Sequence, residues 1–466
     1  MNKKLDLTEG PVFANLLRFS LPLITMNLLQ AIYNIADMAI AGHLTNPEGM
    51  TAITTSGQIT NIILVLIIGF SNGINIITGQ FVGAGKEKGI KDIFQTTVPV
   101  FGLLAIFISL MIGLFSGPLL RLLNMPPAAF DYAKDYLLIC LCGTIFIYLY
   151  NTMAAILRGM GNSFYPMLFV VISTVSNIIL DYLLMGPMHM GVKGAALATI
   201  ISQAASLIMI VLYFLKKTDY LKIKGLRFHI QPQIIKMLVK VGLPQACQFS
   251  ATQISLLLVS GMVNTYGVLA AAAVGASNKT GTFAQLPGQA LNTGVLTTTA
   301  QNLPKNNYKR ILQSMLCALA IGLMISIGFS ALAIFSPITV LGVFTSNSDV
   351  VSIGSFYLTL LSLGFIIENI IYATTGVVSG AGYTPITMTA SMLAAAGRVI
   401  FSVILINTTA LGIYSIGLAA LIAPVIPVII MIIVLLSGKW KTSRIQKEMS
   451  AFKEEPNNNA LFGLPE

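Results

Sequence analysis

The amino-acid sequence predicts an all-α polytopic membrane protein, with twelve transmembrane helices in two pseudo-symmetric six-helix lobes around a central cleft. Three observations predict this fold class: composition, apolar segments of membrane-spanning length, and an internal repeat. Of 466 residues, 55% are hydrophobic and only 9% are charged, whereas about 25% of the residues of an average soluble domain are charged. A soluble fold of this length has too little interior to hide so much apolar surface, so lipid must cover it.

Twelve apolar segments, each near the roughly 20 residues that span a bilayer, are the expected membrane spans. The first six lie at about 13–40, 54–80, 94–116, 132–157, 165–186 and 192–215. The second six lie at about 235–264, 276–300, 312–335, 350–376, 384–407 and 412–437. The predicted units are therefore an N-terminus (1–12), an N-lobe (13–215), a polar basic linker (216–234), a C-lobe (235–437) and a tail (438–466). The tail beyond residue 450 lacks a periodic apolar pattern, which predicts disorder, and no cleaved signal peptide is expected at the amino terminus.

An internal repeat relates the two lobes. The segment LLRFSLP (16–22) returns as LVKVGLP (238–244), and RGMGNSFYP (158–166) returns as SGAGYTP (379–385). The residues Gly73, Thr78 and Gln80 return as Gly294, Thr299 and Gln301, at an offset of about 221 residues. Because each half has six spans, the repeats are expected to be parallel, related by an axis along the membrane normal, with a cleft between them.

The positive charges predict the orientation in the membrane. Most of the 27 Lys and Arg residues fall in segments that face the cytoplasm if the N-terminus does, so the positive-inside rule places both termini there. The net charge of +11 is explained in this way, and we expect no nucleic-acid partner. Five basic residues lie outside or within the membrane in this topology: Arg121, Lys134, Lys193, Lys279 and Arg398.

Three carboxylates lie inside predicted spans: Asp37, Asp181 and Glu368. Such a residue costs about 2.5–3.5 kcal/mol on insertion scales, so an unused one is unexpected. Asp181 follows Asn177 by four residues, so both share one helix face. An amide oxygen and a carboxylate on one face suit a proton or a small hard cation.

The second half lacks this pair. The repeat offset places Arg398 at the position of Asn177, and Ser402 at that of Asp181. Glu368 and Arg398 either neutralise one another across the tenth and eleventh spans, or form a second coupling or substrate-cation site. Ion coupling is therefore expected mainly in the first half.

These landmarks together resemble the multidrug and toxic compound extrusion (MATE) family over about residues 10–440. The motifs are SLP at the start of the first span, YNIADM around Asp37, GQFVGAGK after the second span, LRGMGNSFYP after the fourth, and the repeated GLP and SGAGYTP. Each motif is weak alone, but their order and spacing across twelve spans make the resemblance specific.

The resemblance implies a cation site in the N-lobe. The first-span Asp of similar members falls on Asp37, the fifth-span Asn and Asp on Asn177 and Asp181, the sixth-span Thr on Thr199, and the fourth-span Asn on Asn151. If the ion is Na⁺, its ligands would be Asp37, Asn177, Asp181 and Thr199. These matches favour the DinF-like or MepA-like branches, because the seventh-span Glu of the NorM-like branch falls on Thr252.

The expected function is secondary active antiport by alternating access in the plasma membrane. A monomer would export organic cations or amphiphilic drugs in exchange for H⁺ or Na⁺, with no cofactor. The alternative is a flippase of the same superfamily for lipids or lipid-linked substrates; it should have a strongly cationic lumen, for which Arg398 and Lys193 are the only candidates. An enzyme is not expected, because the 3 His and 4 Cys residues supply no nucleophile–base pair or metal cluster.

Overall fold

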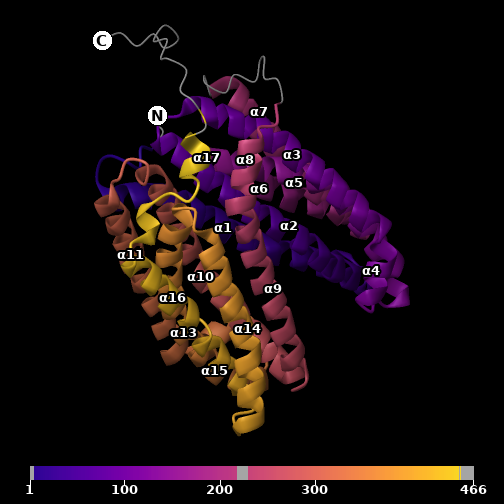
Figure 1. Cartoon of the computed structure of the whole chain (residues 1–466). Helices are drawn as coiled ribbons and strands as arrows, with labels where there is room; N and C mark the ends of the chain where they lie inside the picture. Colours follow the sequence, from indigo (N-terminus) through magenta and orange to yellow (C-terminus); the bar gives the residue numbers. More distant parts are fainter. Residues whose placement is uncertain (1–4, 218–228, 451, 453–466) are drawn as a thin grey trace.

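The computed structural model describes residues 5–217, 229–450 and 452, and every regular element in these ranges is helical. The chain is thus all-α, as the composition predicts (Figure 1). Most of the predicted linker, at 218–228, and the tail at 451 and 453–466 lie outside the described residues. The exact domain boundaries therefore remain predictions.

The long helices coincide with the predicted spans and extend beyond most of them. In the N-half they are α1 (Val12–Leu44), α2 (Pro47–Gly83), α3 (Glu87–Leu114), α5 (Pro127–Gly159), α6 (Phe164–Met185) and α7 (Gly191–Lys217). In the C-half they are α9 (Leu243–Asn264), α10 (Val268–Asn302), α11 (Tyr308–Phe335), α13 (Ser348–Gly380) and α14 (Thr384–Thr408). The seventh span begins with α8 (Pro232–Met237) and the π-helix η2 (Leu238–Gly242), and the last is divided at Ala423 and Pro424 into α15 (Tyr414–Ile422) and α16 (Val425–Leu436).

The two halves are built alike. Short helices that the sequence did not predict follow α3 and α11 at matching places: α4 (Ser116–Leu122) and α12 (Pro337–Gly342). Equivalent helices also pack on equivalent partners, since α2 packs on α5 as α10 does on α13, and α1 packs on α6 as α9 does on α14. The internal repeat in the sequence is therefore a repeat of structure.

Eleven of the described helical spans are long and apolar enough to cross a membrane. The eighth predicted span, α10, is 35 residues long but too polar to meet the same criterion. It is rich in Gly, Ala, Thr, Asn and Gln, and it packs against α1, α2, α11 and α13. Other helices, instead of lipid, contact much of its surface. A hydropathy criterion therefore underestimates the ability of α10 to span the membrane. The count of twelve remains a prediction.

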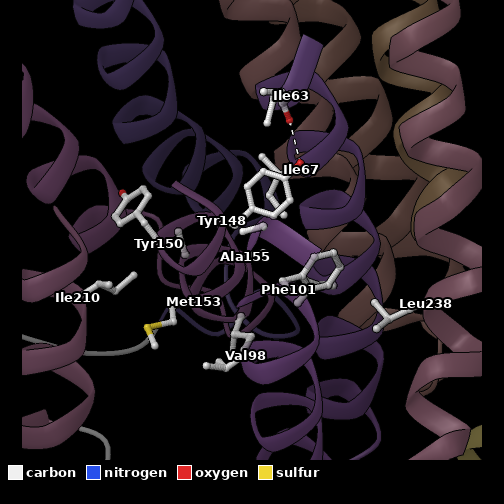
Figure 2. Close-up of a cluster of buried hydrophobic side chains, with 14 of the residues drawn as sticks. Ile63, Ile67, Val98, Phe101, Tyr148, Tyr150, Met153, Ala155, Ile210 and Leu238 are labelled. Atoms are coloured by element: carbon white, nitrogen blue, oxygen red, sulfur yellow. Dashed lines mark hydrogen bonds between the residues drawn. The ribbon is translucent and has the colours of Figure 1, made fainter. Parts of the chain in front are cut away.

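The core of the N-half forms where α2, α3, α5 and α7 meet (Figure 2). Ile67 and Tyr148 are fully buried there, and the Tyr148 hydroxyl donates a hydrogen bond to the Ile63 carbonyl at 3.1 Å. Tyr150 likewise donates to the Pro166 carbonyl at 2.7 Å, which ties α5 to α6. Each buried phenol thus has a partner, as a polar atom in a low-dielectric interior requires.

The halves approach one another closely where α2 crosses η2 and α9. A Cβ on Gly69 would lie 2.3 Å from the Cα of Ala246, and one on Gly73 would lie 2.4 Å from the Cα of Gly242. Only glycine permits backbones to approach so closely. This explains why Gly73 stands in the repeat, where its counterpart Gly294 packs against Ser20 of α1.

A two-fold related pair of hydrogen bonds joins the halves near the end of the bundle that carries both chain termini, here called the terminal end (Figure 1). Gln80 Nε2 in α2 donates to the Gly380 carbonyl at 2.9 Å. Its repeat counterpart Gln301 in α10 donates to the Gly159 carbonyl at 2.8 Å. Both glutamines are buried, so these bonds close the terminal end.

The segment that precedes α1 crosses the terminal end to reach the C-half. The Arg310 guanidinium at the start of α11 donates to the carbonyls of Leu7, Glu9 and Gly10, at 2.7, 2.6 and 2.6 Å. Asn302 donates to the Leu7 carbonyl as well, at 3.1 Å. The N-terminal segment is therefore fastened to the opposite half.

The segment that follows α16 makes the reverse crossing. Its last helix, α17 (Gln446–Ser450), is first anchored within the C-half, where the buried Glu448 lies beside Lys240 of η2 with Nζ and Oε1 2.5 Å apart. Lys86, just before α3, donates to the carbonyls of Met449 and Phe452. Each half thus holds a terminal segment of the other.

Away from the terminal end the halves diverge (Figure 1). The two halves are therefore joined at the terminal end, and their helices are spread apart at the opposite end (Figure 1).

Candidate functional site

The two carboxylates that the sequence places in the first and fifth spans come together in the structure. Asp37 lies in the part of α1 that packs against α6, and its carboxyl group lies beside that of Asp181. Asp181 is fully buried and Asp37 partly so. Two carboxylates that lie side by side repel one another when both are ionised. This repulsion favours a shared proton or a bound cation at the pair.

Asn177 lies one turn before Asp181 on α6 and is also buried, with 4% of its surface exposed. Neither its amide nor the Asp181 carboxylate has a hydrogen-bond partner of normal geometry among the described residues. Buried polar groups are almost always paired. Four unpartnered atoms in one place therefore mark a site built to bind something.

Thr199 of α7 and Tyr33 of α1 complete the cluster. The Thr199 hydroxyl donates to the Ala195 carbonyl at 3.0 Å, which leaves its oxygen free to accept. The Tyr33 hydroxyl interacts with Thr199 and lies near both carboxylates. Sequence reasoning missed Tyr33, although it stands four residues before Asp37 and so shares its helix face.

An apolar layer covers this cluster on the side away from the terminal end. Ala41 and Met185 stand one turn beyond Asp37 and Asp181, and both are buried in a hydrophobic cluster that also contains Tyr136 and Val192. Such a layer excludes water and strengthens electrostatic interactions within the site.

The oxygen atoms here fit Na⁺ as well as H⁺. Asp37, Asp181, Asn177 and Thr199 offer two carboxylates, an amide oxygen and a hydroxyl, which is the ligand type hard cations prefer. In the described part of the chain no three His, Cys, Asp or Glu side chains gather into a group able to hold a metal ion. A bound Na⁺ would therefore rely on neutral oxygens besides the two carboxylates.

Asn151 of α5 makes its hydrogen bond within its own helix. Its amide donates to the Ile147 carbonyl of its own helix at 2.9 Å. No hydrogen bond within the described ranges joins it to Asp37 or Asp181. Its role in ion coupling stays a prediction.

Glu368 of α13 and Arg398 of α14 lie near one another in the C-half, close enough to interact electrostatically. They form no ion-pair contact, and both Glu368 Oε2 and Arg398 Nε are buried without a partner among the described residues. The structure thus brings acid and base into one region without neutralising them by direct contact.

Comparison with known proteins identifies the family. The MatE family profile matches residues 22–183 and 244–404, one match in each half. The chain belongs to the MATE family. This family consists of transporters, so the expectation of a membrane transport protein rather than an enzyme is confirmed.

Curated relatives cover most of the chain at low identity. The probable multidrug resistance protein YoeA of Bacillus subtilis (strain 168) is 27% identical over 66% of this chain and 68% of its own. The multidrug export protein MepA of Staphylococcus haemolyticus is 24% identical over 89% of this chain and 91% of its own. A solved multidrug resistance MATE transporter in an outward-facing conformation superposes with a TM-score of 0.87 at 22% identity, over 96% of this chain and 99% of that one, which confirms the fold.

Proposed function

We propose that this MATE-family protein is an antiporter that exports organic cations or amphiphilic drugs in exchange for H⁺ or Na⁺. The observation that carries the proposal is the meeting of Asp37 and Asp181 beside unpartnered oxygens in the N-half. The names of the relatives YoeA and MepA, which refer to multidrug resistance and export, support the substrate class.

The energetics of such an exchange are sufficient. One charge moving inward through 100 mV releases about 2.3 kcal/mol, whereas export against a hundredfold gradient costs about 2.7 kcal/mol. For a substrate without net charge, one charge together with a modest gradient of H⁺ or Na⁺ therefore drives the export. For a monocation the electrical work of the two movements cancels, so the gradient of H⁺ or Na⁺, or a second entering ion, supplies the energy.

The proposed mechanism begins at the two carboxylates. Binding of H⁺ or Na⁺ between Asp37 and Asp181 removes their repulsion and lets α1 repack against α6. Because a ligand shifts a conformational equilibrium only by its differential affinity for the two states, this repacking must also change substrate affinity. In this proposal the protein acts as a monomer in the plasma membrane, and the basic residues near both termini support a cytoplasmic terminal end by the positive-inside rule. The conformation described here is then open to the outside.

The test is drug efflux from vesicles reconstituted with the purified protein, with pH and Na⁺ gradients imposed separately. Asp37→Asn and Asp181→Asn should each lower gradient-driven efflux about tenfold or more, within the usual range of coupling free energies. The matched control is Asp135→Asn, because the Asp135 side chain is 45% exposed and pairs with Lys193 at 3.1 Å instead of with the Asp37–Asp181 cluster.

Undiminished coupled efflux in both site variants would disprove the N-half assignment. The gradient that drives wild-type efflux identifies the ion. A parallel assay with a fluorescent lipid tests the flippase alternative: lipid movement without drug efflux would replace the proposed function.

A further inference from the structure

Several polar residues of α10 lie on one face of the helix. Asn278, Thr282, Gln285 and Gln289 recur every three or four residues and so form one stripe on the helix. All of them are exposed or partly exposed, although α10 is surrounded by other helices and 22 of its residues are buried. A polar stripe left open inside a membrane protein lines a water-filled space rather than lipid.

The stripe belongs to a larger cluster of polar side chains. Tyr372 of α13 donates a hydrogen bond from its hydroxyl to Gln285 Oε1 at 3.3 Å, and it also lies beside Gln289. Glu368 stands one turn before Tyr372 on the same helix, and Arg398 approaches from α14. Three helices thus bring an acid, a base, a phenol and two amides to one wall of the C-half.

The charges in this cluster are not satisfied by the protein. Glu368 and Arg398 make neither an ion pair with each other nor a side-chain hydrogen bond to any described residue, and each has a buried polar atom without a partner. A static structural ion pair would bring the two groups into contact, because burying separated charges is costly. Their lack of direct contact leaves each charge without a close protein partner of opposite sign.

The N-half has no equivalent wall. The repeat offset of about 221 residues places Leu64, Ile68 and Ile147 where the C-half has Gln285, Gln289 and Glu368. Arg398 stands at the position of Asn177, which belongs to the ion site. The two halves have therefore diverged in chemistry, one toward binding the coupling ion and the other toward a polar ligand.

We infer that the C-half wall formed by Gln285, Gln289, Glu368, Tyr372 and Arg398 is a substrate site for dipolar amphiphiles. Its ligands carry both a cationic group, which pairs with Glu368, and a carboxylate, which pairs with Arg398. The Gln and Tyr side chains supply hydrogen bonds and ring contact between the two charged ends. This inference rests on the proposed export function and narrows its substrate class from cations to zwitterions.

The experiment is equilibrium binding to the purified full chain in detergent, followed by fluorescence anisotropy. The probes are a rhodamine free acid, a zwitterion at neutral pH, and its methyl ester, a monocation of nearly the same shape. Wild-type protein should bind the acid about tenfold or more tightly than the ester, because the acid alone offers a carboxylate to an unpaired buried guanidinium. This comparison requires no mutant and so does not depend on any variant folding.

Variants test which side chain binds each charged end of the ligand. Arg398→Gln should abolish the preference for the acid, whereas Arg398→Lys should keep much of it because the charge remains. Glu368→Gln should weaken the binding of the acid and of the ester by a similar factor, since both probes carry a cationic group. Asp135→Asn, which changes a residue paired with Lys193 outside this wall, should leave the ratio of acid to ester affinity unchanged.

Equal binding of the two probes by wild-type protein, or a preference that survives Arg398→Gln, would overturn this site. Either result would leave the ion-coupling proposal intact, because that proposal is tested by efflux in the Asp37 and Asp181 variants. Conversely, normal coupling in those variants, with the acid preference retained, would refute the coupling proposal and leave the dipolar site standing.

Discussion

The paired glutamines at the terminal end allow the closed state to be tested directly. Inward opening must break the hydrogen bonds from Gln80 to the Gly380 carbonyl and from Gln301 to the Gly159 carbonyl. Methionine has nearly the shape of glutamine but donates no hydrogen bond. We therefore predict that the double variant Gln80→Met/Gln301→Met shifts the protein toward a state that is open at the terminal end.

The magnitude follows from the two bonds. Each net contribution is about 1 kcal/mol, so the pair stabilises the closed state by about 2 kcal/mol. That free energy corresponds to a factor of about 30, at 1.4 kcal/mol for each factor of ten. An open state populated at about one per cent would rise to about a quarter of the molecules. The two carbonyls left without donors lie in a buried environment, so the true shift should be at least this large.

The assay measures the distance between the halves by spin labelling and pulsed electron resonance. Labels at Lys91→Cys and Lys309→Cys report on the terminal end, since both side chains are exposed near the starts of α3 and α11. The four native cysteines are first replaced. The double variant should show a second, longer distance that is minor or absent in the parent protein.

A suitable control is Gln203→Met, because Gln203 of α7 faces Gly143 of α5, within the N-half. It should keep the parental distance distribution. An unchanged distribution in the double variant, or the same new peak in the control, would refute the view that these glutamines hold the terminal end closed.

Three further predictions concern the terminal segments. Lys240→Ala should detach the tail helix, since it removes the closest partner of Glu448; limited proteolysis after Lys447 should become faster. Burial alone would raise the pKa of Glu448, but the hydrogen bond and charge of Lys240 outweigh it and hold the pKa below its usual value. The tail attachment should therefore persist at neutral pH and weaken only as the pH falls below the usual pKa range of a glutamate and through the depressed pKa of Glu448. Arg310→Lys should lower the free energy of unfolding by about 3 kcal/mol, measured as a fall in the melting temperature in detergent, because one ammonium group cannot bridge three backbone carbonyls as the guanidinium does; a melting temperature equal to that of the parent would contradict this.

Much of the fold could be predicted because lipid imposes strong rules on sequence. Spans of apolar residues and a repeat at nearly constant offset were enough to locate every long helix and to relate the halves. The sequence also located α10, as the eighth span, but this helix shows the limit of a hydropathy criterion: its polar stripe and small residues make sense only once its protein neighbours are known. The short helices α4 and α12 were missed because each joins directly to an apolar run.

The charged residues of the site could be predicted because a charge costs free energy inside a membrane. Asp37 and Asp181 stood out as buried charges, and the structure brings them together. Tyr33 carries no charge, so nothing in composition distinguished it from other aromatic residues. The crossing of the terminal segments was invisible to sequence, because Arg310 and Glu448 look like ordinary residues of a basic, polar surface.

The path of α1 suggests how ion binding in the N-half is coupled to the C-half. This helix carries Asp37 near one end, while the segment before its other end is fastened to the C-half by Arg310. Its 33 residues, at 1.5 Å each, span about 50 Å, and Pro22 interrupts its hydrogen bonding near the terminal end. Along this length α1 packs first on α10 and then on α6. A change of charge at Asp37 that moves α1 against α6 must therefore also act on α10, whose exposed polar stripe forms the proposed substrate wall.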